Sequence, residues 1–383
     1  MCLQIPGGWL ADKVGGRWFY GGGILVSSVV SLLTPVAAGI HICMLVVLRI
    51  LAGMSQGTMP PAVQSLFARW SQPKYRSAVI SINKSGAALG TCVGMLVTGI
   101  LCDNNIAGGW PAVFYLFGII GLFWSVVWFL FCYSSPATHP CISKTERQYW
   151  EQAVGTAQSA ARPPAPWGQI LTSIPVWAVI VSAFSQAWGF FTIQTCIPLY
   201  MYDVLGFNMT KNGIVSGLPF LLLVPLDPAV GILTDWLRAP GRLSTKVVRK
   251  SLVTTGYAIS CLSFISIMYT GCNRALAVLF LCTAVGGSAM SMPNVITNIH
   301  DLAPLHAGKL IALAMAGASL AGIGGPLVVG ELTHQHSTYD DWRTVFFICA
   351  AMYVVGAFSF VVFGSTERQS WAEPPKPEEM TKK

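Results

Sequence analysis

Ten long apolar segments, separated by short polar ones, constrain this chain more than any other feature of its sequence. Each has roughly the 20 residues that an α-helix needs to cross the hydrocarbon core of a bilayer. Only 10% of the 383 residues are charged, against about 25% in soluble domains. The sequence therefore predicts an all-α polytopic membrane protein. The predicted spans are Phe19–Gly39, Ile42–Phe67, Ala78–Leu101, Val113–Tyr133, Val176–Tyr200, Asn212–Thr234, Ser251–Thr270, Ala275–Thr297, Leu310–Leu332 and Val345–Phe363.

The basic residues lie mainly in the segments on one side of these predicted spans. Only Lys211, Arg274 and Arg343 fall between spans on the other side. Because loops rich in Lys and Arg remain in the cytoplasm, we expect the C-terminus to be cytoplasmic. The net charge of +8 is spread over separate segments and forms no single basic face, so no nucleic-acid partner is expected.

A polar segment rich in proline separates two groups of spans. We expect an N-terminal helical bundle at residues 1–133, a cytoplasmic linker at 134–173, a C-terminal helical bundle at 174–366 and a cytoplasmic tail at 367–383. Met1–Leu10 is apolar but too short to cross a membrane alone, and it resembles the end of a helix.

A short pattern occurs once in each predicted bundle. In both copies a glycine is followed four residues later by an aspartate and then by a basic residue, at a predicted cytoplasmic helix end: Gly8, Asp12 and Arg17, then Gly231, Asp235 and Arg238. Related halves are typical of pseudo-symmetric transporters. We expect Asp12, Arg17, Asp235 and Arg238 to form gating contacts, with solvated loop charges as the alternative.

Several motifs resemble those of a known family. Gly8-Trp-Leu-Ala-Asp-Lys-Val-Gly-Gly-Arg17 is similar to the loop signature of the major facilitator superfamily. Arg49-Ile-Leu-Ala-Gly-Met-Ser-Gln-Gly57 and Asn298-Ile-His-Asp-Leu-Ala-Pro-Leu-His-Ala-Gly308 resemble the sialin, vesicular glutamate and sodium–phosphate transporter family within it.

This resemblance implies a fold of two pseudo-symmetric helical bundles that carries a small organic or inorganic anion by alternating access. It implies H+ or Na+ as the coupling ion, no cofactor, a monomer, and a plasma, lysosomal or vesicular membrane. Since the loop signature follows the second of twelve helices in that superfamily, we expect this chain to lack the first helix and part of the second.

Two residues of the span Ile42–Phe67 are candidates for substrate binding. Arg49 lies well inside the span, where a charge costs about 2.5–3.5 kcal/mol and marks function by default. Its planar guanidinium suits a carboxylate or phosphate, although a structural Arg reaching the interface is the alternative. Gln56 lies seven residues on, on the same helix face. The resembled family often has a glutamate there for proton coupling, so Gln56 puts that coupling residue in doubt.

Further candidates lie in other segments. Lys84 would add a second positive contact for substrate, or else extend to the cytoplasmic surface. Asp227, between Pro225 and Pro228, is a coupling candidate for a proton or cation; the alternative is pairing with a loop arginine. Asn208 begins an Asn-Met-Thr glycosylation sequon on the predicted outer side.

Three other classes of protein remain as alternatives to a carrier. An inactive fragment and a non-transporting anion sensor or channel on the same fold both stay open. An intramembrane enzyme is disfavoured, because no Ser–Lys or His–Asp arrangement occurs at matching depth, and no spacing typical of a metal site is present.

Overall fold

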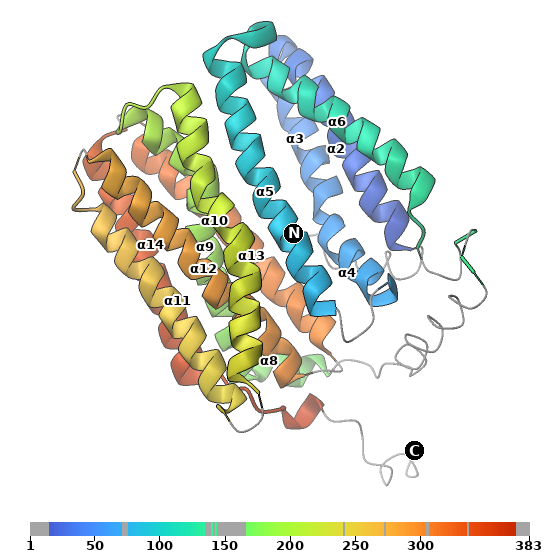
Figure 1. Cartoon of the computed structure of the whole chain (residues 1–383), viewed down its shortest axis with the longest axis vertical. Coiled ribbons are helices and arrows are strands. Elements are labelled where there is room, and N and C mark those ends of the chain that lie inside the picture. Colours follow the sequence, from blue (N-terminus) through green and yellow to red (C-terminus); the bar gives the residue numbers. More distant parts are fainter. Residues whose placement is uncertain are drawn as a thin grey trace. The chain divides into compact units, whose positions relative to one another are not determined.

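The computed structural model describes residues 15–70, 76–134, 139–140, 142–143, 166–239, 242–271, 273–303, 306–334 and 337–372, and all regular structure in these ranges is helical. The described ranges contain 10 candidate membrane spans, each helical and long and apolar enough to cross a membrane (Figure 1). Each of the ten predicted spans is thereby confirmed to within a few residues at either end. Residues 1–14, on which the predicted partial helix and Asp12 fall, lie outside the described residues.

The chain divides into two compact units, which are described separately. The first unit contains both ends of α5, whose middle, residues 84–96, belongs to the second unit. Its helices are α2 (Gly16–Ile40), α3 (Ile42–Gly57), α4 (Met59–Trp70), α5 (Arg76–Asp103), η1 (Ile106–Gly108) and α6 (Trp110–Phe131).

The predicted span Ile42–Phe67 is interrupted at Thr58, between α3 and α4. Pro60 and Pro61 follow immediately, and proline has no amide hydrogen to continue the helical hydrogen bonds. At the interruption the Thr58 hydroxyl donates to the Ser55 carbonyl at 2.8 Å. The two helices still form one candidate span, Ile42–Phe67.

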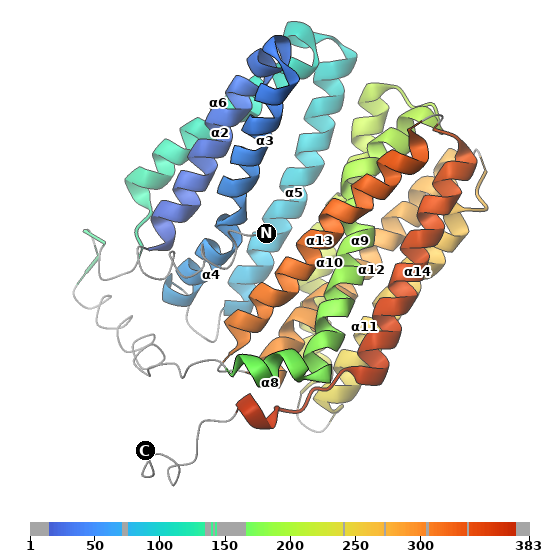
Figure 2. The same cartoon turned by 180° about the vertical axis from the view of Figure 1, so that it is seen from behind.

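Helix α2 packs between α3 and α6 in the first unit (Figure 2). Gly118 and Gly121 of α6 allow a close approach to α2, because a Cβ at these positions would lie 2.6 Å from Leu32 Cδ2 and 2.1 Å from Ser28 Oγ. Such small residues commonly line helix interfaces in membranes, where close backbone packing replaces the hydrophobic effect.

The second unit contains the remaining helices together with the middle of α5. They are α8 (Trp167–Thr172), α9 (Ile174–Asp203), α10 (Met209–Leu237), α11 (Thr245–Ile267), α12 (Arg274–Leu302), α13 (Ala307–Thr333), α14 (Tyr339–Phe363) and η3 (Ser370–Ala372). Residues 144–165 of the predicted linker lie outside the described residues, and α8 forms the linker's last part.

Helix α9 is the central helix of the second unit, in contact with α10, α12, α13 and α14 (Figure 2). In the most apolar 18-residue stretch of α9, 67% of the residues are buried, compared with at most 44% in the corresponding stretch of any other candidate span. The outer faces of the neighbouring helices carry large exposed apolar side chains, including Ile232, Leu262 and Leu327. An apolar exterior around a partly polar interior is the arrangement that a lipid environment requires.

Candidate functional site

Arg49 is an intramembrane cation in the first unit. It lies two turns into α3, and its side chain is exposed, whereas the nearby Leu48 and Ala52 of the same helix are buried. The guanidinium carbon lies 5.0 Å from the centroid of the Phe114 ring of α6, a cation–π distance. Among the described residues Arg49 has no acidic partner within 4 Å. The guanidinium therefore keeps its hydrogen-bond donors available for an anion.

Gln56 is also exposed and lies near the end of α3. Seven residues separate it from Arg49, so the two side chains share one helix face, as the sequence predicts. The neighbouring Ser55 already has a hydrogen-bond partner, since its hydroxyl oxygen lies 2.9 Å from the Ser27 hydroxyl oxygen of α2. Gln56 offers both a donor and an acceptor to whatever Arg49 binds.

Lys84 and Asp227 are two oppositely charged residues of the second unit. Lys84 lies in the middle part of α5 and Asp227 in α10, and their charges interact with each other. Both side chains are half-buried. Next to Lys84, the Ser85 hydroxyl donates to the Val224 carbonyl at 3.3 Å. Pro228 cannot donate the amide hydrogen bond that would otherwise occupy this carbonyl, so the proline provides the acceptor for Ser85.

The described residues predicted to form gating contacts differ in their surroundings. Arg17 at the start of α2 donates to the Phe129 carbonyl and lies 4.6 Å from the centroid of the Tyr133 ring. Asp235 and Arg238 at the end of α10 are exposed and interact electrostatically with Arg249 of α11.

Asn208 is the N-cap of α10, and its side-chain oxygen accepts a hydrogen bond from the Lys211 amide at 3.1 Å. Its side chain is exposed. An Asn at this position satisfies one of the free amide groups of the first helical turn, so the sequon residue also has a structural role.

Arg249 was not singled out by the sequence analysis, yet it is the most buried described arginine. It is 2% exposed; its Nε donates to Asp301 Oδ2 of α12 at 3.1 Å and its Nη1 to Asn294 Oδ1 at 2.8 Å. In the sequence it is one of many basic residues near a cytoplasmic helix end. Only the packing of α11 against α12 distinguishes it.

A second buried polar contact also escaped the sequence analysis. Gln186 of α9 is 2% exposed, and its side-chain oxygen accepts a 2.7 Å hydrogen bond from the Ser291 hydroxyl of α12. The Gln186 side-chain nitrogen has no partner among the described residues. Uncharged residues within apolar spans are common, so nothing in the sequence separates this pair from other serines and glutamines.

Comparison with known proteins extends over nearly the whole chain. The sequence matches the family model of the Major Facilitator Superfamily over residues 1–240 and 239–383. Sialin of Homo sapiens is 37% identical over 371 residues, which cover 96% of this chain and 74% of sialin. Vesicular glutamate transporter 3 of Danio rerio is 34% identical over 375 residues, covering 97% of this chain but only 63% of that relative.

Two further comparisons agree. A protein of Drosophila ananassae, provisionally named an inorganic phosphate cotransporter, is 34% identical over 379 residues, covering 98% of this chain and 78% of that protein. Among solved structures, the crystal structure of a D-xylose-proton symporter aligns with a TM-score of 0.72 at 16% identity, covering 95% of this chain and 84% of the symporter. At that identity the likeness concerns the fold alone.

Proposed function

This chain belongs to the major facilitator superfamily, and on that premise we propose that it is a secondary active transporter of small organic or inorganic anions. Relatives named sialin, vesicular glutamate transporter and inorganic phosphate cotransporter support an anionic substrate. Alternating access, a monomeric state, a cytoplasmic C-terminus and a plasma, lysosomal or vesicular membrane are parts of the same proposal.

The observation that carries the proposal is the free guanidinium of Arg49. A cation inside a span is costly and by default marks a functional site, and among the described residues the aromatic or charged contact recorded for this guanidinium is the face of Phe114. A carboxylate or phosphate can accept two parallel hydrogen bonds from a guanidinium. Gln56 would add one neutral hydrogen bond on the same face.

The decisive test is uptake by the protein reconstituted in proteoliposomes, with phosphate, sialate, glutamate and urate as substrates. Arg49→Ala should lower kcat/KM for the transported anion by about 10–100-fold, since a hydrogen bond to a charged group contributes about 1.5–3 kcal/mol. Arg343→Ala is the matched control, because Arg343 is an exposed arginine paired with Asp340. Unchanged uptake of all four anions by Arg49→Ala would remove Arg49 from substrate binding.

We propose Lys84 and Asp227 as the coupling pair. When Asp227 is ionised it neutralises Lys84; when it binds a proton or its charge is balanced by Na+, Lys84 is free to attract the anion. Asp227→Asn should therefore flatten the dependence of uptake on pH or sodium, with Asp340→Asn as the control. An unaltered dependence would exclude Asp227 from coupling.

The gating role of Asp12, Arg17, Asp235 and Arg238 is also a proposal. Neutralising Asp235 should change kcat with little change in KM, because a gating contact alters the inward–outward equilibrium without touching substrate.

Glycosylation at Asn208 would be detected as a shift in electrophoretic mobility after glycosidase treatment, and this shift should be absent in Asn208→Gln.

A sensor or channel on the same fold is the second candidate function, alongside an inactive fragment. Counterflow distinguishes these possibilities, because only a carrier exchanges labelled substrate against unlabelled substrate on the other side. Uptake that neither saturates nor shows counterflow would favour the channel, and binding without uptake would favour the sensor.

A further inference from the structure

A surface rich in basic residues lies at the end of the second unit where α10 turns into α11. Its four cations, spaced four residues apart in the sequence, are Arg238, Arg242, Lys246 and Lys250. The first three are exposed and Lys250 is half-buried. Of these four, only Lys246 has an acidic partner among the described residues, Glu367 at 4.0 Å. Most of this positive charge is therefore available to an anion.

The turn between the two helices fixes the backbone that carries these cations. The Leu243 amide donates to the Leu237 carbonyl at 3.3 Å, which ties the residues before α11 to the end of α10. The Arg242 side chain is held as well. Its Nη1 donates to the Trp236 carbonyl at 3.0 Å, and its guanidinium carbon lies 3.8 Å from the centroid of the Trp236 ring. Arg242 is thus oriented before any ligand binds and still remains exposed.

The fold leaves part of this positive charge uncompensated. The charges of Lys246 and Lys250 repel each other, and Arg238 repels the buried Arg249. Lys246 also lies in the first turn of α11, which contains no acidic residue and carries the positive end of the helix dipole. Its pair with Glu367 compensates little, because the two side chains are 57% and 79% exposed. A bound anion would relieve this repulsion.

Two other carboxylates at this end of the unit are engaged with Arg249. Asp301 pairs with Arg249 at 3.1 Å, and the charge of Asp235 also interacts with that arginine. With Glu367 they make three described acidic residues against five basic ones. The surface therefore keeps an excess of positive charge.

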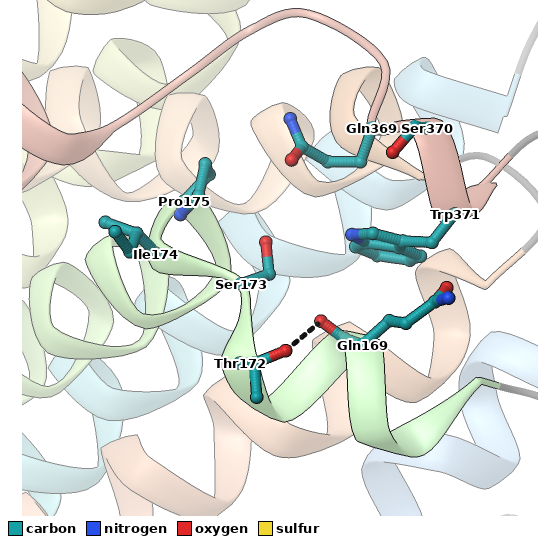
Figure 3. A pocket seen from close by; sticks show the side chains of 8 residues that line it. All are labelled: Gln169, Thr172, Ser173, Ile174, Pro175, Gln369, Ser370 and Trp371. Carbon is teal, nitrogen blue, oxygen red and sulfur yellow. Dashed lines mark hydrogen bonds between the residues drawn. The ribbon is translucent and has the colours of Figure 1, made fainter.

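A cavity of about 550 Å³ also lies in the second unit, where α8, the start of α9 and η3 meet (Figure 3). Its lining residues include Gln169, Ser173 and Trp371, and none of them is acidic or basic. An anion gains no attraction between opposite charges there, so the basic surface is the stronger candidate for an anionic ligand.

Apolar side chains next to the cations indicate which kind of anion fits. Trp236, Leu243 and Val247 are 55%, 47% and 51% exposed. One candidate span ends at Leu237 and the next begins at Thr245. The turn therefore lies at the level where lipid headgroups meet hydrocarbon, and tryptophan is common at this level. A soluble phosphate would use the cations alone, whereas a lipid with an anionic headgroup matches both kinds of side chain.

Basic residues at helix ends also orient a chain in the membrane. That requirement concerns only the side on which the charge lies, and basic residues meet it with or without partners. It does not account for Arg242 held on an exposed tryptophan, nor for two lysines that repel each other. Clusters of basic residues immediately next to a span are, in contrast, typical of binding to anionic lipids.

We propose that this surface binds the headgroup of an anionic phospholipid. Arg242 and Lys246 donate hydrogen bonds to the phosphate oxygens, the charge of Lys250 adds attraction, and the acyl chains lie along Trp236 and Val247. With the C-terminus cytoplasmic, as proposed above, the surface faces the leaflet that carries the anionic lipids. The site uses none of the residues proposed for substrate binding or coupling, so it is independent of the proposed transport function.

Binding can be measured on the purified, delipidated chain in detergent by native mass spectrometry, with dioctanoyl phosphatidylserine as the titrant. We expect Arg242→Gln and Lys246→Gln each to weaken binding about fivefold, and the double variant about 25-fold, the losses that correspond to one and two basic residues near a membrane surface. Lys211→Gln is the matched control, because Lys211 is an exposed lysine in the first turn of α10, at the opposite end of that helix from Trp236. This control should change the affinity less than about twofold, and so should Lys246→Arg, which keeps the charge.

Two further titrants separate an anionic lipid from a neutral lipid and from a soluble phosphate. Dioctanoyl phosphatidylcholine should bind at least about tenfold more weakly, because its headgroup has no net charge, and so should inorganic phosphate, because it has no acyl chains. Equal binding of phosphatidylcholine would overturn the recognition of charge, and equal binding of inorganic phosphate would overturn the lipid assignment. Unchanged affinity in Lys246→Gln would overturn the site itself. This variant remains informative if Arg242→Gln disturbs the turn, because the Lys246 side chain is exposed and its described acidic partner is the exposed Glu367.

Discussion

The buried ion pair between Arg249 and Asp301 should contribute more to stability than any exposed pair in the described residues. The two side chains are 3% and 21% exposed, with 3.1 Å between Nε and Oδ2. Asp301→Asn would leave the Arg249 charge buried without its counter-ion. Removing one partner of a buried pair costs about 3–5 kcal/mol. Because Asp301 is partly exposed and Asn294 still accepts from Arg249, we expect about 3 kcal/mol.

The pair of Arg343 and Asp340 is a matched control with the same 3.1 Å separation but side chains 47% and 82% exposed. Exposed pairs contribute about 0–1 kcal/mol. Unfolding in mixed micelles by increasing SDS, followed by tryptophan fluorescence, compares Asp301→Asn with Asp340→Asn. The double variant Arg249→Met with Asp301→Asn should recover part of the lost stability, since it removes the unpaired charge. Equal losses in the buried and the exposed pair would refute the reasoning.

Three further predictions concern other contacts. Phe114→Leu should raise KM for the anion by about 2–30-fold through loss of a cation–π contact, measured as uptake and compared with Phe117→Leu. Gly256→Ala should destabilise the fold by about 1–3 kcal/mol, because the added Cβ would lie 2.6 Å from the Gly287 carbonyl oxygen. Gly231→Ala places its Cβ in open space and should stabilise the fold by about 0.5–1 kcal/mol. Both variants are measured in the same SDS titration. Burial, and secondarily the charge of Lys309, lowers the pKa of His306 below its ordinary 6.5. The folded chain therefore disfavours protonation of His306, and the free energy of unfolding should fall as the pH drops below about 6.5. His306→Asn should reduce that fall, which is measured by thermal unfolding at pH 5 and 7.

Hydropathy was enough to predict the membrane spans, because each depends on a property of consecutive residues. The ten apolar segments correspond to the 10 candidate spans of the described residues, and the interruption at Thr58 has a local cause in Pro60 and Pro61. Intramembrane charge was likewise visible in the sequence, and the motif around Arg49 was sufficient to indicate the family. Each of these features is encoded within a short stretch of chain.

Features formed by two distant segments could not be predicted in the same way. Arg249 lies 52 residues from Asp301 along the chain, and Gln186 lies 105 residues from Ser291. From the sequence, one alternative for Asp227 was pairing with a loop arginine. In the structure the charge of Asp227 interacts with that of Lys84. No local pattern specifies such pairs, because they depend on which helices become neighbours and on the rotation of each helix about its axis.

Arg49 and Arg249 show why partners matter more than residue type for assigning function. Both arginines lie in apolar helices, and the sequence marked only Arg49. The Arg249 guanidinium already has a carboxylate and an amide oxygen as acceptors, so a substrate anion would have to displace Asp301 and pay its desolvation again. Arg49 faces an aromatic ring, which orients the guanidinium but accepts little of its hydrogen-bonding capacity. An anion therefore gains most by binding Arg49, and the same physical chemistry assigns Arg249 to the stability of the second unit.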